Sequence, residues 1–139
     1  MKRRVPTDLG LLQYIYDQHK DEFSRFEENH SGRETKIYIP IDCLAIANHF
    51  KTDPDIIFGR LYYHLERQFG LSNPDGSVTP FFSKQVGGDL NCVNFPLLVS
   101  ILAGLQQENR HFWTATGIAI LALGISVLSL GISLWQYKP

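Results

Sequence analysis

Residues 112–135 read FWTATGIAILALGISVLSLGISLW, and this stretch contains no aspartate, glutamate, lysine or arginine. At a rise of about 1.5 Å per residue, roughly twenty of these residues span the hydrocarbon layer of a bilayer, which is about 30 Å thick. The two ends carry aromatic and basic side chains that favour the headgroup zone: Arg110, Phe112 and Trp113 at one end, and Trp135, Tyr137 and Lys138 at the other. The pattern predicts one transmembrane helix over residues 112–136. The alternative is a buried core helix, which is usually shorter and keeps some charged positions.

Two faces of this expected helix carry small residues. Six of them recur at steps of three and four residues and form one stripe along a helix: Ala115, Ala119, Ala122, Ser126, Ser129 and Ser133. Gly117, Gly124 and Gly131 recur every seven residues close to the opposite side. Because small residues let helices approach closely in lipid, we expect a homo-oligomer, either cyclic or an open array. The alternative is that these residues are merely common in membrane spans.

The rest of the chain is polar enough for a soluble domain. All charged side chains except Lys138 precede residue 111, and the 139 residues leave room for one domain plus an appendage. No apolar segment of adequate length lies before Asp17, so we expect no signal peptide. The expected location is therefore a membrane, single-pass, with the N-terminal domain cytosolic and lipid around the span. Cys43 and Cys92 are expected to be reduced core residues.

Residues 7–95 show a mixture of helical and strand patterns. Thr7 is a candidate cap for a helix that runs to about Glu28, and residues 36–39 form a β-prone segment. Asp42 is a candidate cap for a second helix, and a third is expected over residues 54–69, with Gly70 at its end. Ile57, Leu61 and Leu65 form the expected buried face of the third helix. Residues 78–86 and 90–95 then predict a β-hairpin, with Pro80 at an edge or bulge.

The segment 42–71 resembles winged helix-turn-helix domains. The resemblance rests on the Leu44-Ala45 pair, the turn at residues 51–54, the later leucines Leu61 and Leu65, and the Gly70-Leu71 exit into the wing. It implies an α+β fold with a winged-helix domain in residues 1–95, followed by a connecting helix and polar collar over 96–111 and the transmembrane helix over 112–136. Many unrelated functions share this pattern, so the resemblance informs the fold far more than the activity.

The charge pattern does not favour nucleic-acid binding. If the third helix were a recognition helix, its first turn would present Asp53 and Asp55 to the phosphates. Residues 36–95 contain five basic and six acidic side chains, so the clustered basic face of DNA-binding domains is missing. Arg60, Tyr63 and Arg67 follow one another at three- and four-residue steps on the outer face of this helix. They are candidates for binding a protein partner or small ligand, and the alternative is a solvated helix face.

No catalytic or metal-binding motif stands out. The five histidines are scattered, and no phosphate-binding loop or nucleophile elbow occurs, so we expect no enzyme, no metal and no cofactor. The sequence favours a membrane-anchored oligomer whose cytosolic winged-helix-like domain binds a partner or ligand and controls assembly of the spans, one version being a membrane-perturbing effector. The alternative function is a membrane-tethered DNA-binding transcription regulator.

Overall fold

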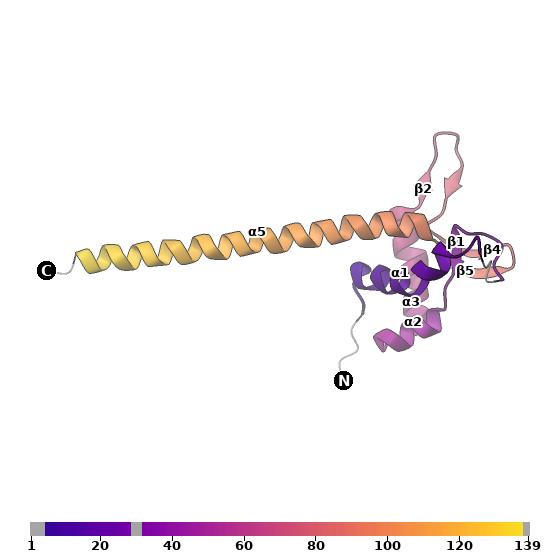
Figure 1. Cartoon of the computed structure of the whole chain (residues 1–139), viewed down its shortest axis with the longest axis horizontal. Helices are drawn as coiled ribbons and strands as arrows, with labels where there is room; N and C mark the ends of the chain where they lie inside the picture. The colour runs from indigo at the N-terminus through magenta and orange to yellow at the C-terminus, as the bar shows by residue number, and fades with distance from the viewer. Residues whose placement is uncertain (1–4, 29–31, 138–139) are drawn as a thin grey trace. The chain divides into compact units, whose positions relative to one another are not determined.

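The computed structural model describes residues 5–28 and 32–137 (Figure 1). The chain divides into two compact units, one ending at Ala103 and the other beginning at Gly104. The first unit is a mixed α and β domain with a small sheet, and the second is helical. The elements, in chain order, are α1 (Asp8–Ser24), β1 (Tyr38–Pro40), α2 (Cys43–Phe50), α3 (Pro54–Gly59), the π-helix η1 (Arg60–Leu65), α4 (Glu66–Phe69), β2 (Leu71–Ser72), β3 (Val78–Thr79), β4 (Phe82–Val86), β5 (Asp89–Asn94) and α5 (Phe95–Gln136).

Helix α1 begins where the sequence predicts and ends earlier. The Thr7 hydroxyl oxygen accepts a hydrogen bond from the backbone N–H of Gly10 at 3.1 Å, which caps the helix. The expected end at Glu28 is wrong, because the helix stops at Ser24 and tighter three-residue turns follow it. These turns let the Phe26 ring fold back and become buried.

Two helical segments with acidic caps follow β1. One carboxylate oxygen of Asp42 accepts from the N–H groups of the second and third residues after it, at 2.8 and 3.0 Å, and Asp53 caps α3 in a similar way. The expected third helix over 54–69 is helical throughout, but its middle is the π-helix η1. There the Glu66 N–H donates to the carbonyl of Leu61, five residues back. The predicted buried face is confirmed, since Ile57, Leu61 and Leu65 are fully buried.

The sheet is antiparallel and has the strand order β1-β5-β4. The predicted hairpin is confirmed for β4 and β5, where Phe82 lies opposite Val93. The expected continuous strand over 78–86 is wrong, because Pro80 lacks the N–H that a ladder requires and lies between β3 and β4. Strand β3 pairs instead with β2 in a separate two-stranded ribbon, which Figure 1 shows extending away from the sheet.

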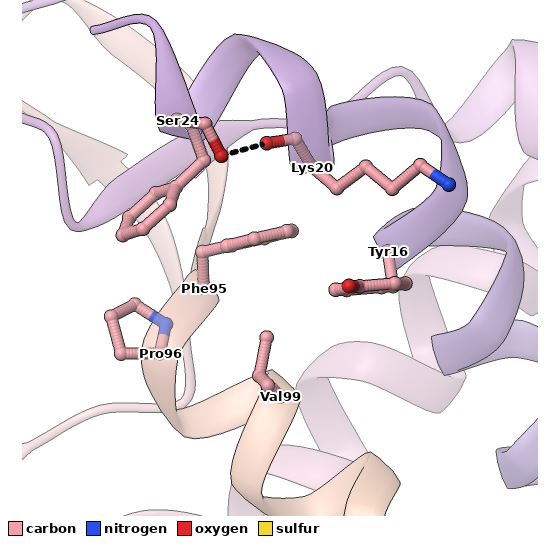
Figure 2. A pocket seen from close by; sticks show the side chains of 7 residues that line it. Tyr16, Lys20, Ser24, Phe95, Pro96 and Val99 are labelled. Carbon is pink, nitrogen blue, oxygen red and sulfur yellow. Dashed lines mark hydrogen bonds between the residues drawn. The ribbon is translucent and has the colours of Figure 1, made fainter.

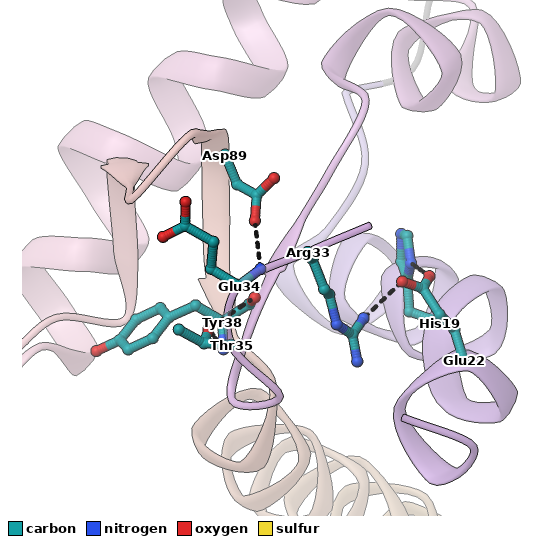
Figure 3. A network of polar contacts seen from close by, with 7 residues as sticks. All are labelled: His19, Glu22, Arg33, Glu34, Thr35, Tyr38 and Asp89. Carbon is teal, nitrogen blue, oxygen red and sulfur yellow. Dashed lines mark hydrogen bonds and ion pairs between the residues drawn. The ribbon is translucent and has the colours of Figure 1, made fainter. Parts of the chain in front are cut away.

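A polar network holds the loop that precedes β1 (Figure 3). The buried guanidinium of Arg33 donates to the Glu22 carboxylate of α1 at 2.6 Å and lies 4.8 Å from the centre of the Phe26 ring. On the other side of the loop, the Glu34 N–H donates to the Asp89 carboxylate at 3.3 Å. These contacts connect α1 to the β4–β5 turn and fix the path of the chain between them.

Helix α5 has 42 residues and two different kinds of environment. Phe95, Leu98 and Leu102 in its first turns are buried at three- and four-residue spacing in the first unit. From Gly104 onward almost every described side chain is exposed. Among the described residues, α5 is the one helix long and apolar enough to cross a membrane, and none of its most apolar segment is buried.

Candidate functional site

The sequence places Arg60, Tyr63 and Arg67 on one helix face, but the π-helix η1 gives Arg60 different neighbours from the other two. A π-turn contains one more residue than an α-turn, so the side chains beyond it are rotated relative to those before it. The Arg60 guanidinium turns toward α1 and donates to the Asp8 carboxylate, whose second oxygen lies 3.1 Å from His64 Nε2. Tyr63 and Arg67, in contrast, both lie beside strand β4. The structure therefore brings two of the three candidate residues together and gives Arg60 a different neighbourhood.

Tyr63 and Arg67 line an open hollow of about 680 Å³, which we call the η1–β4 hollow. Its lining residues come from η1, α4 and β4 and are Tyr62, Tyr63, Glu66, Arg67, Phe82, Ser83 and Lys84. The two tyrosine rings meet edge to face with their centres 5.0 Å apart. The Lys84 ammonium lies 4.2 Å from the centre of the Tyr62 ring, within the range of a cation–π contact. The hollow therefore combines two aromatic faces with two cationic groups.

The single carboxylate of the hollow is already engaged. One oxygen of Glu66 accepts the backbone N–H of Phe82 at 2.6 Å, which ties α4 to the first residue of β4. Within residues 5–28 and 32–137, neither Arg67 nor Lys84 has a carboxylate within ion-pair distance. The hollow is thus lined by two cations without an ion-pair partner and by one carboxylate, which leaves a formal excess of one positive charge.

Sequence reasoning did not include Tyr62 and Lys84 in this surface. Tyr62 follows Leu61 directly and reads as support for the buried face, and the structure places it half-buried in the lining of the hollow. Lys84 lies in a different element, and only the approach of β4 to η1 brings its ammonium to the Tyr62 ring. No local pattern in the sequence reports such a pairing.

A second hollow of about 350 Å³ lies between α1 and the first turn of α5 (Figure 2). The Phe95 ring lies parallel to the Tyr16 ring, with the centres 5.9 Å apart, and 4.9 Å from the Phe23 ring. The Ser24 hydroxyl donates to the Lys20 carbonyl at 2.9 Å and so directs its proton to the backbone. This hollow is apolar and lacks the convergent polar groups that orient a ligand.

Both cysteines are free thiols, and Cys92 lies in the core as expected, whereas the expected core position of Cys43 is wrong because this side chain is only half-buried. Burial raises the pKa of Cys43, and the neighbouring Asp42 charge adds to this effect. Burial also raises the pKa of Cys92, with a smaller contribution from Asp89. Because the thiolate is the reactive form, a raised pKa makes both side chains poor nucleophiles at neutral pH.

The six residues of the small-residue stripe of α5 are all exposed. Three of its hydroxyls donate to carbonyls of the same helix at 2.8 to 2.9 Å: Ser126 to Ala122, Ser129 to Ser126 and Ser133 to Ser129. An added Cβ on Gly117, Gly124 or Gly131 would meet nothing within 4 Å. Both small faces are open, and the serine protons are satisfied inside the helix, so close backbone packing rather than interhelical donation is what these faces offer a neighbour.

Across the described part of the chain, no three histidine, cysteine, aspartate or glutamate side chains form a group that could hold a metal ion. No protein-family profile matches the chain, and neither a curated protein nor a solved structure does.

Proposed function

We propose that this chain is a non-enzymatic, single-pass membrane protein with its N-terminal domain in the cytosol. The observation that carries the proposal is the exposure of the apolar part of α5, where Ile120 is 67 % exposed and Leu128 is 68 % exposed. A core helix hides such residues, and soluble proteins rarely leave a large continuous apolar surface in water. A bilayer would cover this surface. The two free thiols are consistent with the reducing cytosol.

The N-terminal domain is proposed to be winged-helix-like. Two features support this: the order of α1, β1, α2, the helix from α3 to α4, β4 and β5, and the antiparallel sheet with β5 in the centre. The β2–β3 ribbon begins at Leu71, where the resemblance places the start of the wing.

This domain is proposed to bind a small ligand or a protein partner rather than DNA. The η1–β4 hollow supports a ligand role, because it combines aromatic faces with unpaired cations. Asp53 and Asp55 lie at the start of α3, where a phosphate backbone would meet negative charge. We expect random duplex DNA to bind more weakly than about 10⁻⁴ M at physiological salt.

The spans are proposed to assemble through the small-residue stripe, and the domain is proposed to control that assembly. Replacing both Ala122 and Ser126 with leucine keeps the span apolar enough to insert but adds bulk where backbones would come closest. We expect cross-linking of the full-length protein in membranes to show loss of the oligomer in this double variant.

The matched control changes Ile125 and Ile132 to leucine. These residues lie between the two small faces, so the control conserves volume outside the stripe, and its oligomer should match that of the unaltered chain. If the Ala122 and Ser126 double variant also retains a full oligomer, the stripe has no role in assembly, and the contact lies either in the N-terminal domain or on the glycine face of α5.

A further inference from the structure

The side chains of the η1–β4 hollow indicate which class of ligand it binds. Tyr63 is 71 % exposed, although burial of an aromatic ring is usually favourable. Its ring lies edge to face with the Tyr62 ring, with the centres 5.0 Å apart, and most of its surface is open to solvent. A positioned and uncovered aromatic ring is a platform on which a planar ring can stack.

Two cations border the same platform. The Lys84 ammonium lies over the Tyr62 ring, and its N–H groups that point away from the ring remain able to bind an anion. The Arg67 guanidinium has five donors in a planar fork that matches phosphate oxygens. Glu66, the one carboxylate of the hollow, accepts the Phe82 N–H and forms no ion pair with either cation, so the lining has a formal excess of one positive charge.

The backbone supplies a second, independent observation. The segment Arg60–Leu65 is a π-helix, a rare and irregular form that occurs preferentially at functional sites. A regular α-helix would place Tyr63 and Arg67 closer to the face of Arg60, which is occupied by the contact with Asp8. The π-turn thus separates a structural ion pair from an open surface.

We propose that the η1–β4 hollow binds a nucleoside phosphate, with the base stacked on Tyr63 and the phosphates held by Arg67 and Lys84. The inference rests on the proposed ligand-binding role of the domain and names the class of ligand. The volume of about 680 Å³ is within the usual range for small-molecule sites, about 300–1,000 Å³.

A mononucleotide fits this surface better than a nucleic-acid strand. A strand needs a row of cations that follows its backbone over several nucleotides. The hollow offers two cations, and the start of the same helix carries Asp53 and Asp55. The charges therefore match one short phosphate chain.

The test is calorimetric titration of the full-length protein in detergent micelles. The probes are the four common nucleoside triphosphates, adenosine, inorganic tripolyphosphate and a single-stranded thymidine 15-mer. We expect saturable binding of at least one triphosphate, because stacking tolerates different bases. Adenosine and tripolyphosphate should each bind at least about tenfold more weakly, because each lacks one of the two recognised parts.

Two variants report on the two parts of the site. Tyr63→Ala and the double variant Arg67→Gln with Lys84→Gln should each weaken triphosphate binding about tenfold or more. The matched control is Arg25→Gln with Lys51→Gln, which removes the same charge from exposed positions outside the hollow. The control should bind like the unaltered chain, and circular dichroism should show the same helix content in all variants.

Four outcomes would overturn the inference. The first is that no triphosphate binds, and the second is that the Arg67 and Lys84 variant and the Arg25 and Lys51 control lose the same amount of triphosphate affinity. The third is that tripolyphosphate binds as tightly as the triphosphates, and the fourth is that the 15-mer binds more tightly than any of them. Two further measurements test the proposed function separately. Cross-linking of the same preparation reports the oligomer, and carbonate extraction of the membranes before detergent is added reports membrane integration. An intact oligomer that binds no nucleotide refutes the ligand class alone, whereas a chain that does not integrate into membranes refutes the proposed function.

Discussion

Two apolar helical segments of this chain use similar residues in opposite ways. In the helix from α3 to α4, apolar side chains recur on one face, and Leu61 is fully buried. In the C-terminal part of α5 the apolar residues surround the helix, and Leu128 is 68 % exposed. The distribution of apolar residues around a helix, rather than their number, indicates whether protein or lipid is the expected neighbour.

The glycines of the two units also have different surroundings. An added Cβ at Gly70 would lie 2.7 Å from the carbonyl oxygen of Glu66, because the chain turns sharply there. The glycines of α5 beyond Ala103 have open space around them. In the first unit, therefore, a glycine serves the fold of this chain, whereas those in α5 leave room for a neighbour.

The largest expected effect comes from removing the exposed segment. Deletion of residues 112–139 should convert a protein that sediments with membranes into one that stays in the supernatant, because the apolar surface that requires lipid is lost. The truncated chain should remain folded, since its buried residues all precede residue 103. Carbonate extraction followed by circular dichroism measures both properties. If the truncated chain still sediments with membranes, the C-terminal part of α5 is not the segment that requires lipid.

A pair of leucine truncations tests burial directly. Leu61→Ala should reduce the free energy of unfolding of the N-terminal domain by about 2–5 kcal/mol, because it leaves a cavity in the core. Leu128→Ala should change the same quantity by less than about 0.5 kcal/mol, since this side chain is 68 % exposed and its removal leaves no cavity in the core. Pulse proteolysis in urea measures both values. Similar losses in the two variants would contradict the assignment of separate environments.

A smaller effect is expected from the ion pair that η1 forms with α1. Asp8→Asn removes the carboxylate that faces Arg60 and His64, and it should cost about 1.5 kcal/mol of domain stability. Asp17→Asn is the matched control, since its contact with Lys20 is 3.7 Å long and half-exposed, and it should cost less than about 0.5 kcal/mol. Equal values for the two variants in the urea assay would show that the Asp8 contact does not anchor η1.

The smallest expected effect concerns the β2–β3 ribbon. The Ser77 hydroxyl and backbone N–H donate to the Asp75 carboxylate at 2.6 and 2.9 Å and hold its pKa below the ordinary value. A lowered pKa in the folded state gives stability that is present above the unfolded pKa and is lost as the pH falls through the folded one. NMR titration of the Asp75 carboxyl should therefore show protonation at lower pH than in a model peptide. The difference should become smaller in the Ser77→Ala variant, which loses the hydroxyl, but should not disappear, because the backbone N–H of residue 77 still donates to Asp75.

Local signals explain why several elements follow from the sequence. Thr7, Asp42 and Asp53 cap helices because their side-chain oxygens reach N–H groups only two or three residues away. Likewise, the uncharged run from residue 112 requires no knowledge of any other segment to predict a long apolar helix. For such features the interacting groups are close in the chain, so composition and spacing contain the necessary information.

The tertiary structure alone decided the contacts between distant segments. It placed Arg60 on Asp8, Lys84 on the Tyr62 ring and Arg33 against Glu22. It also divided the expected strand at Pro80, and β3 pairs with β2 rather than with β5. Each of these results depends on which surfaces meet after the chain has packed, and the π-turn that directs Tyr63 and Arg67 to the hollow belongs to the same class. Packing of this kind is a property of the whole domain, so no short segment of the sequence determines it.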